Sequence, residues 1–350
     1  MIVGGQWGSE GKGLFAGYIA RRRNPDSVVC QFGPNAGHTW IEDNKPIVFK
    51  SLPVASIAPS IKNIFLGPGS VINPEILKKE VESLKKFLGD KNIFIHENVA
   101  TIDEGDVREE RGLGTGYGTA HIASTMQGTS EAMIRKIRRL HTRVDIRRLF
   151  NYMPVAVVDH VTYKKYMSQS NEIQIEGAQG MDLSINVGHE YPYVTSRDCT
   201  PAQVLADCGM HPADLLRIYA CIRTYPIRVG NVYNDDGTLR GTSGPYYLDQ
   251  RELSWTEIGQ PEEYTTVTKR VRRVFSFSMM QTRKLLGEVR PDGIFLNFGN
   301  YLPKEELDLL VNNINRLSDN IVKWVGYGPK DIDIHELPPP PRKPVIVFAD

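Results

Sequence analysis

The sequence predicts an α/β protein with a mainly parallel central sheet and helices on both of its faces. Two observations support this fold class. Short apolar runs of strand type alternate with segments of helical periodicity, and a glycine-rich loop directly follows the first run. The expected strands cover residues 1–3, 28–32, 92–95, 155–158, 173–176, 218–223, 293–296 and 345–348.

The expected helices begin and end at recognisable signals. Asn73 can cap a helix that has Pro74 at its first position, continues to Leu88 and ends at Gly89. Another helix follows the glycine-rich loop and runs to about residue 23. A proline run at 338–341 predicts a stiff connection before the last strand. Further helices are expected over residues 130–140, 201–208, 270–286 and 303–317. No shift in composition marks a boundary, so we expect one domain over residues 1–350 with long functional loops.

Composition narrows the class of protein. Lys plus Arg number 42 and Asp plus Glu 41, a net charge of +1, so overall charge does not hold this chain on nucleic acid or anionic membranes. The 4 cysteines form neither a CxxC pair nor a zinc-type spacing, which favours reduced thiols. No run of 18 apolar residues and no signal-peptide pattern is present. We therefore expect a cytoplasmic protein that binds neither nucleic acid nor membranes.

The glycine-rich loop at residues 4–13 predicts a phosphate site. Its glycines let backbone N–H groups turn inward, a helix start follows, and Lys12 supplies a positive charge. The spacing differs from a Walker motif, since five residues separate Gly5 from Gly11, and Gly13 stands where a magnesium-binding Ser or Thr belongs. A plain glycine turn is the alternative, but the order of strand, loop, lysine and helix favours nucleotide binding.

A second segment, residues 32–39, follows the second expected strand and contains His38. A single histidine in a loop is usually structural or solvated. The carboxyl end of a strand is, however, where open α/β sheets bind ligands, and an imidazole there can donate to a developing oxyanion. His38 is therefore a candidate catalytic residue.

The two segments, GGQWGSEGKG and GPNAGHT, closely resemble adenylosuccinate synthetases, which join aspartate to IMP at the expense of GTP. The resemblance continues through residues 122–125, 176–180, 191–196 and 266–273, in the order of the family and over nearly the whole chain. It implies an adenylosuccinate synthetase-like fold, related to the P-loop proteins, and a reaction through a 6-phosphoryl purine. It also implies Mg²⁺ as a cofactor.

The resemblance assigns a role to individual residues. It implies that His38 is the general acid, and that Ser9, Lys12 and Gln179 are the other catalytic residues. Magnesium would be held by Ser9 and the carbonyl of Gly37. The triphosphate donor would be bound by Gly8, Glu10, Gly11, Lys12, Gly13, Gly37, His38, Thr39, Asn297, Gly328 and Pro329. The purine monophosphate would be bound by Ser9, Asn35, Ser124, Thr125, Arg139, Gln179 and Thr195. Aspartate would be bound by Thr266, Val267, Thr268, Arg270 and Arg272.

Arg139 matches an arginine that reaches the monophosphate of the neighbouring subunit, which implies a homodimer. It lies in a basic run from Arg135 to Arg148, most of which we expect to be a solvated helix face.

Ser9 departs from the family, which has an Asp there as the base at purine N1 and as a magnesium ligand. A serine hydroxyl is a poor base, so the protein is either inactive or acts on a different purine. A small viral branch of the family carries this serine and uses dGMP, whose 2-amino group would fit beside the shorter side chain. We therefore expect dGMP and L-aspartate to be substrates and the cytoplasm of a host cell to be the location of the protein. A water, a carboxylate of the substrate aspartate or Glu10 would replace the missing base.

The donor segment also departs from the family, because residues 296–300 lack the Asp with which GTP-using synthetases recognise guanine. Asn297 or Asn300 can donate as well as accept, which favours ATP or dATP. Two alternatives stay open: an ordinary synthetase acting on IMP with GTP, and a catalytically silent nucleotide-binding protein. A general P-loop ATPase fits the loop spacing less well.

Overall fold

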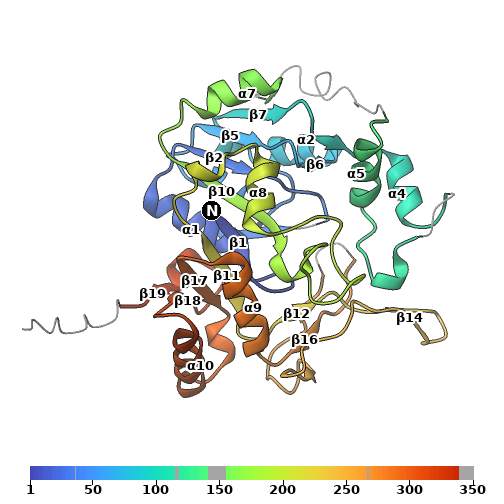
Figure 1. The fold of residues 1–350 in the computed structure, drawn as a ribbon, viewed down its shortest axis with the longest axis vertical. Coiled ribbons are helices and arrows are strands. Elements are labelled where there is room, and N and C mark those ends of the chain that lie inside the picture. The colour runs from blue at the N-terminus through green and yellow to red at the C-terminus, as the bar shows by residue number, and fades with distance from the viewer. Residues whose placement is uncertain (36, 115–117, 141–154, 266–267, 339–350) are drawn as a thin grey trace, which may run out of the picture.

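A ten-stranded sheet forms the centre of this computed structural model (Figure 1). The structure describes the chain except residues 36, 115–117, 141–154, 266–267 and 339–350. The strand order is β19-β18-β17-β11-β1-β10-β2-β5-β7-β9, and all neighbours are parallel except the edge pair β18 and β19. These strands are β1 (Ile2–Gly4), β2 (Ser27–Cys30), β5 (Asn63–Leu66), β7 (Asn92–His96), β9 (Val155–Val158), β10 (Ile173–Gly180), β11 (Tyr219–Arg223), β17 (Gly293–Asn297), β18 (Val322–Gly326) and β19 (Ile334–Glu336).

Alternate residues of each strand enter two separate apolar cores, one on each face of the sheet. Ile2 belongs to the first core and its neighbour Val3 to the second, and Val28 and Val29 divide in the same way. Because both faces are covered, most of the strands read as continuous apolar runs, which is why the sequence reveals them. Three strands of the sheet, β5, β18 and β19, were not expected from the sequence.

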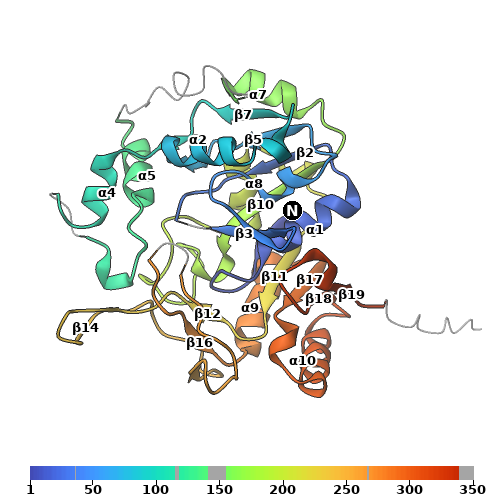
Figure 2. The same ribbon diagram turned by 180° about the vertical axis from the view of Figure 1, so that it is seen from behind.

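The first core is covered by α1 (Lys12–Arg23), α2 (Pro74–Ser83), α3 (Lys85–Leu88), the 3-10 turn η1 (Val54–Ile57) and the hairpin of β3 (His38–Glu42) and β4 (Lys45–Phe49), seen in Figure 2. The second core is covered by α7 (His160–Met167), α8 (Pro201–Cys208), α9 (Met279–Val289) and α10 (Lys304–Leu317), seen in Figure 1. The fold class expected from the sequence is therefore confirmed.

Smaller elements lie beyond the carboxyl ends of the parallel strands. The helices α4 (Glu104–Glu110) and α5 (Thr129–Ile137) pack together on one side (Figure 1). A three-stranded sheet of β12 (Ile227–Arg228), β16 (Arg273–Phe275) and β15 (Glu252–Leu253) lies on another. The remaining short elements are β6 (Val71–Ile72), β8 (Ala100–Thr101), β13 (Val232–Tyr233), β14 (Leu239–Gly241), η2 (Ala120–Ile122), η3 (Met181–Leu183), η4 (Pro212–Asp214), η5 (Gly299–Tyr301) and η6 (Asp331–Asp333).

Two helix predictions need correction. The helix expected to run from Pro74 to Leu88 is two helices that meet at Leu84, although Asn73 caps the first by accepting from the N–H of Ile76. The helix expected over residues 270–286 begins at Met279, because Ser278 caps it and residues 273–275 are a strand between β12 and β15. The last expected strand, residues 345–348, lies outside the described residues, as does most of the proline run.

All four cysteines are buried and unpaired, as the spacing suggested. Among the described residues, none of the helices combines the length and the apolar character needed to cross a membrane.

Two helical glycines give a stability test of the packing between α1 and the β3–β4 hairpin. A Cβ atom on Gly17 would lie 2.4 Å from the ring of Trp40, which is fully buried. We expect Gly17→Ala to lower the free energy of unfolding by ~1–3 kcal/mol because the ring cannot move aside. Gly287→Ala is the matched control, since nothing lies within 4 Å of its Cβ position, and helix propensity should stabilise it by up to ~1 kcal/mol. Urea denaturation measures the free energy of unfolding of both variants. Equal changes in the two variants would contradict the packing argument.

Candidate active site

A cavity of about 620 Å³ lies where the parallel strands end, the edge at which open α/β sheets bind ligands. The loops after β1, β2, β10 and β11 contribute to its wall, together with residues around α5 and the three-stranded sheet. The structure brings together most of the site residues expected from the sequence. Those on the wall are Gly8, Ser9, Gly11, Lys12, Gly13, Asn35, Gly37, His38, Thr39, Ser124, Thr125, Gln179, Thr195 and Arg272.

The phosphate loop joins β1 to α1 and turns at Gly8 and Gly11, which have φ of 94° and 84°. Glu10, which is not on the cavity wall, sits inside this loop. Its Oε1 accepts from the backbone N–H groups of Gln6 (3.1 Å) and Gly8 (2.8 Å), and its Oε2 accepts from the ammonium of Lys12 at 2.8 Å. The loop thus holds an anion with inward amides and a lysine, the arrangement that a phosphate requires.

His38 is the first residue of β3 and lies on the cavity wall with its ring stacked on Phe32, the centroids 4.3 Å apart. Burial and, second, the nearby charge of Lys12 lower the pKa of His38 to about 3. The imidazole is therefore neutral at physiological pH and can donate one N–H into the cavity.

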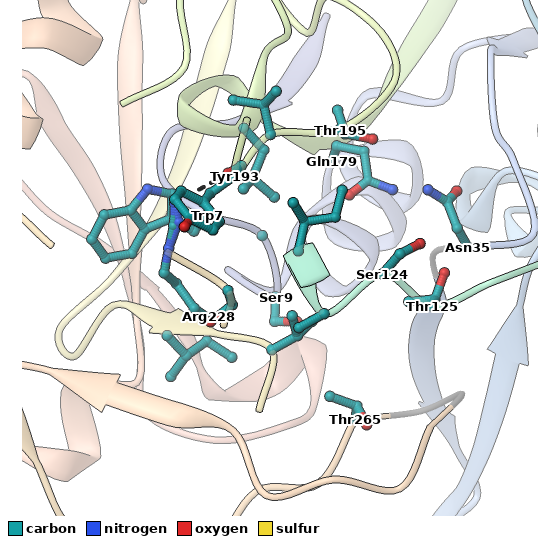
Figure 3. A pocket seen from close by; sticks show the side chains of 18 of the residues that line it. Trp7, Ser9, Asn35, Ser124, Thr125, Gln179, Tyr193, Thr195, Arg228 and Thr265 are labelled. Atoms are coloured by element: carbon teal, nitrogen blue, oxygen red, sulfur yellow. Dashed lines mark hydrogen bonds between the residues drawn. The ribbon is translucent and has the colours of Figure 1, made fainter. Parts of the chain in front are cut away.

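Polar side chains gather at one end of the cavity, called the acceptor end because the purine monophosphate is expected there from the sequence. Figure 3 shows Asn35, Ser124 and Thr125 together on one side, with Gln179 and Thr195 beside them. Figure 3 also shows Ser9 across the cavity from these side chains. This cluster offers hydroxyl and amide groups, which suit a phosphate and the edge of a base.

Glu110, at the end of α4, holds the segment that carries these hydroxyls. Its carboxylate accepts from the hydroxyls of Ser124 (3.2 Å) and Ser130 (3.0 Å) and from the N–H of Gly128. It therefore fixes the start of α5 relative to the cavity. No sequence motif pointed to this residue.

Four non-glycine residues on the cavity wall have left-handed backbone conformations. They are Ser9 (φ 56°), Ala123 (φ 55°), Gln179 (φ 63°) and Phe298 (φ 60°). Such conformations are unfavourable for residues with a Cβ atom and concentrate at binding and catalytic sites. The presence of four such residues on this wall supports the identification of the cavity as the active site.

The expected aspartate loop lies against the acceptor end. Arg272 is on the wall, and burial lowers the pKa of its guanidinium. Arg270 is not on the wall, since it donates to the carbonyls of Gly230 and Ser124, both at 3.1 Å. The hydroxyl of Thr268 bonds that of Thr265 at 2.6 Å. Thr266 and Val267 lie outside the described residues.

The expected donor-base residues lie beside the cavity rather than on its wall. The amide of Asn297 donates to the carbonyl of Glu10 (3.3 Å) and accepts from the N–H of Phe298 (2.9 Å). A Cβ atom on Gly326, the last residue of β18, would lie 2.3 Å from the Oδ1 atom of Asn297, so the two late segments adjoin. Gly328 and Pro329 follow after Tyr327. Arg139 is exposed and lies just beyond α5, away from the wall.

Several wall residues were missed by the sequence analysis. Trp7 lies within the first motif but received no role, and Arg228 places its guanidinium over the Trp7 ring at 4.5 Å. Glu263 also lies on the wall and binds Arg223, which is buried at the end of β11. A charged residue that ends a buried strand was the available signal for Arg223.

A phosphate loop, a neutral histidine and a polar cavity at one sheet edge are typical of a nucleotide-binding enzyme. The sequence model of the adenylosuccinate synthetase family matches residues 1–153 and 145–297, and the chain belongs to this family. Its members are ligases that form a carbon–nitrogen bond.

Individual relatives cover nearly the whole chain. The N6-succino-2-amino-2'-deoxyadenylate synthase of Salmonella phage PMBT28 is 41% identical over 95% of this chain and 96% of its own length. The enzyme of the same name from Acinetobacter phage SH-Ab 15497 is 39% identical, over 92% and 89%. A solved structure of the cyanophage S-2L succinoaminodeoxyadenylate synthetase, bound to dGMP and to dATP as an energy donor, has a TM-score of 0.87 and 37% identity, covering 96% of this chain and 94% of that one.

The low pKa of His38 predicts an acid sensitivity. The unfolded imidazole takes up a proton near pH 6.5 and the folded one only near 3, so stability is lost as pH falls through this window. At pH 5 the loss due to His38 should be about 2 kcal/mol relative to pH 8. Urea denaturation at both pH values should show a smaller loss in His38→Asn, whereas the exposed control His335→Asn should follow the wild type. If His38→Asn lost as much stability between pH 8 and pH 5 as the wild type, the lowered pKa of His38 would be contradicted.

Proposed function

We propose that this protein joins L-aspartate to C6 of dGMP, with ATP or dATP as the phosphoryl donor, and so forms a 2-amino-deoxyadenylosuccinate. The observation that carries the proposal is the short hydroxyl side chain of Ser9 on the cavity wall, across from Asn35, Ser124 and Thr125. The names of the phage relatives and the dGMP and dATP in the cyanophage enzyme support the same substrates.

The acceptor nucleotide would bind with its phosphate among Asn35, Ser124 and Thr125 and its base beside Gln179 and Thr195. Hydroxyl and amide donors suit phosphate oxygens, and an amide suits the mixed donors and acceptors of a purine edge. The short side chain of Ser9 would leave room for an exocyclic 2-amino group, which a longer acid would obstruct. This supports guanine over hypoxanthine as the accepted base.

The reaction would then proceed in two steps. The terminal phosphoryl group of the donor passes to the 6-oxygen of the purine, and the amino group of aspartate then forms a bond to C6 while the C6–O bond breaks and phosphate leaves. Lys12 would exchange its bond to Glu10 for one to the donor phosphates. His38, neutral and on the cavity wall, would donate its N–H to the 6-oxygen as charge develops there.

The proton at N1 needs an acceptor other than Ser9. Glu10 is fully buried inside the phosphate loop and bound to Lys12, which disfavours it as this base. Among the described residues of the wall, the carboxylates are those of Glu110 and Glu263, and both are engaged in hydrogen bonds. A water or a carboxylate of the substrate aspartate is therefore the proposed acceptor.

Mg²⁺ would fit this site if the phosphates supply most of its ligands. The described residues contain no group of three or more His, Cys, Asp and Glu side chains suited to a metal. Magnesium commonly binds through few protein oxygens together with phosphates and water, and Ser9 and the carbonyl of Gly37 offer such oxygens on the wall. Bound there, the cation would neutralise charge on the transferring phosphoryl group.

A homodimer would complete the acceptor site. Arg139 is exposed just after α5, next to Ile137 and Leu140, which are 72% and 55% exposed. Apolar side chains exposed around an arginine suit a contact with a second copy of the chain. The partner's arginine would then reach the monophosphate. The host-cell cytoplasm is the proposed location, as expected for a phage enzyme.

A direct assay tests the substrates. The pure protein is incubated with aspartate and either dGMP or IMP, each with ATP, dATP or GTP, and phosphate release and the succinylated product are measured. We expect turnover with dGMP and an adenine donor. Turnover with IMP and GTP alone would identify an ordinary synthetase. Nucleotide binding without phosphate release in every mixture would identify a silent binder.

Ser9→Asp tests the source of the acceptor preference. A carboxylate beside the 2-amino position removes space and restores a base, so the ratio of kcat/KM for dGMP to that for IMP should fall at least ~10-fold, about 1.4 kcal/mol. Ser9→Ala is the matched control, because it keeps the space and should keep the ratio. A ratio that Ser9→Asp leaves unchanged would remove the argument for dGMP.

A further inference from the structure

Arg223 ends β11 in the middle of the sheet and is fully buried, although it is an arginine. Its Nη1 atom donates to the backbone carbonyl of Ser9 at 3.2 Å and to Oε2 of Glu263 at 3.1 Å, and its Nη2 atom donates to Oε1 of Glu263 at 2.6 Å. A single guanidinium thus binds the phosphate loop and a residue 40 positions further along the chain.

Glu263 lies at the base of the expected aspartate loop. Its backbone carbonyl accepts from the N–H of Arg272 at 2.8 Å, and the hydroxyl of Tyr301 donates to its carboxylate at 3.3 Å. Its side chain is 22% exposed and lines the cavity. Any shift of Glu263 therefore moves the backbone of Arg272, which also lines the cavity.

The donor-base side of the site is in contact with the same arginine. The Arg223 guanidinium stacks over the ring of Phe298 with its carbon 3.9 Å from the centroid. Thr224, the next residue, donates its hydroxyl to the carbonyl of Phe298 at 2.8 Å. Arg223 consequently touches the phosphate loop, Glu263 at the base of the aspartate loop and the segment expected at the donor base.

A buried ion pair contributes little net stability, because desolvation of both charges offsets their attraction. Arg223 even leaves its Nε atom without a hydrogen-bond partner. The two-point fork between guanidinium and carboxylate does, however, fix the distance and the orientation of both groups. Its geometry therefore suits positioning better than stabilisation.

We infer that Arg223 and Glu263 form a positioning clamp that couples the aspartate loop to the backbone of Ser9, an inference that rests on the proposed ligase function. The clamp holds Arg272 at a fixed place relative to the acceptor purine, so that the amino group of aspartate meets C6. Both are positioning residues, because they act through Ser9 and Arg272.

The test compares two glutamate variants that each break one ion pair of 2.6 Å. Glu263→Gln weakens the clamp, and Glu252→Gln weakens the pair between Glu252 and Arg273, which lies on the neighbouring strands and off the cavity wall. Steady-state kinetics are measured for aspartate, acceptor and donor, using the acceptor that the wild type turns over. Amide exchange of the ligand-free protein is measured over residues 6–11.

We expect Glu263→Gln to raise the KM for aspartate at least ~10-fold and to lower kcat, with the KM values for acceptor and donor changed less than ~2-fold. Exchange over residues 6–11 should become faster, since Arg223 no longer holds Ser9 firmly. Glu252→Gln should change none of these values more than ~2-fold. Arg223→Lys combined with Glu263→Gln should be no worse than the more severe single variant, because both break one unit.

Two results would overturn the clamp: an unchanged aspartate KM in Glu263→Gln, or a parallel rise of all three KM values with faster exchange throughout the chain, which would indicate a structural role. A wild type that does not turn over dGMP defeats the proposed function instead. The exchange comparison between Glu263→Gln and Glu252→Gln still judges the clamp in that case.

Discussion

The close approach of the phosphate loop to the end of β10 is the constraint on which the rest of the site depends. β1 pairs with β10 on one side and β11 on the other, so the loops that follow these strands must share one small space. Glycine permits this. A Cβ atom on Gly180 would lie 2.0 Å from the carbonyl of Gln6, and one on Gly4 would lie 2.6 Å from that of Gln179. Larger side chains would push Ser9 and Gln179 apart and open the acceptor site.

The charges of Glu10 and Lys12 balance each other inside that space. Glu10 occupies the ring of inward amides and neutralises Lys12, both buried. A buried lysine without a partner would be strongly unfavourable, so the carboxylate of Glu10 stabilises the ammonium of Lys12. Under the proposed function, binding of a triphosphate would exchange one anion for another. The lowered pKa of His38 follows first from its burial and second from the charge of the same ammonium.

Two buried arginines connect the phosphate loop to other segments around the cavity. Arg223 joins three loops around the cavity, and Arg228 covers Trp7 behind the phosphate loop. Arg223 ends β11 at the sheet edge where open α/β sheets bind ligands, so its position follows from the parallel topology, whereas Arg228 lies in β12 of the antiparallel three-stranded sheet. In this arrangement the rigid sheet fixes the phosphate loop, while long-range ion pairs fix the loops that come from distant parts of the chain.

The sequence by itself determined the fold class, most strand positions and the residues of the local motifs, because apolar periodicity and glycine-rich loops are encoded by neighbouring residues. Lys12 and His38 were found from such motifs and Ser9 and Gln179 from the resemblance to the family, and all four lie on one cavity wall. It failed at residues 270–278, where charged and apolar residues imitate a helix and pairing with β12 and β15 imposes a strand. Only the tertiary structure decided that Glu10 lies inside the loop, that Arg270 binds backbone carbonyls, and that Glu110, Arg223 and Glu263 belong to the site. These contacts join residues far apart in the chain, and their energies depend on burial that no local pattern reports.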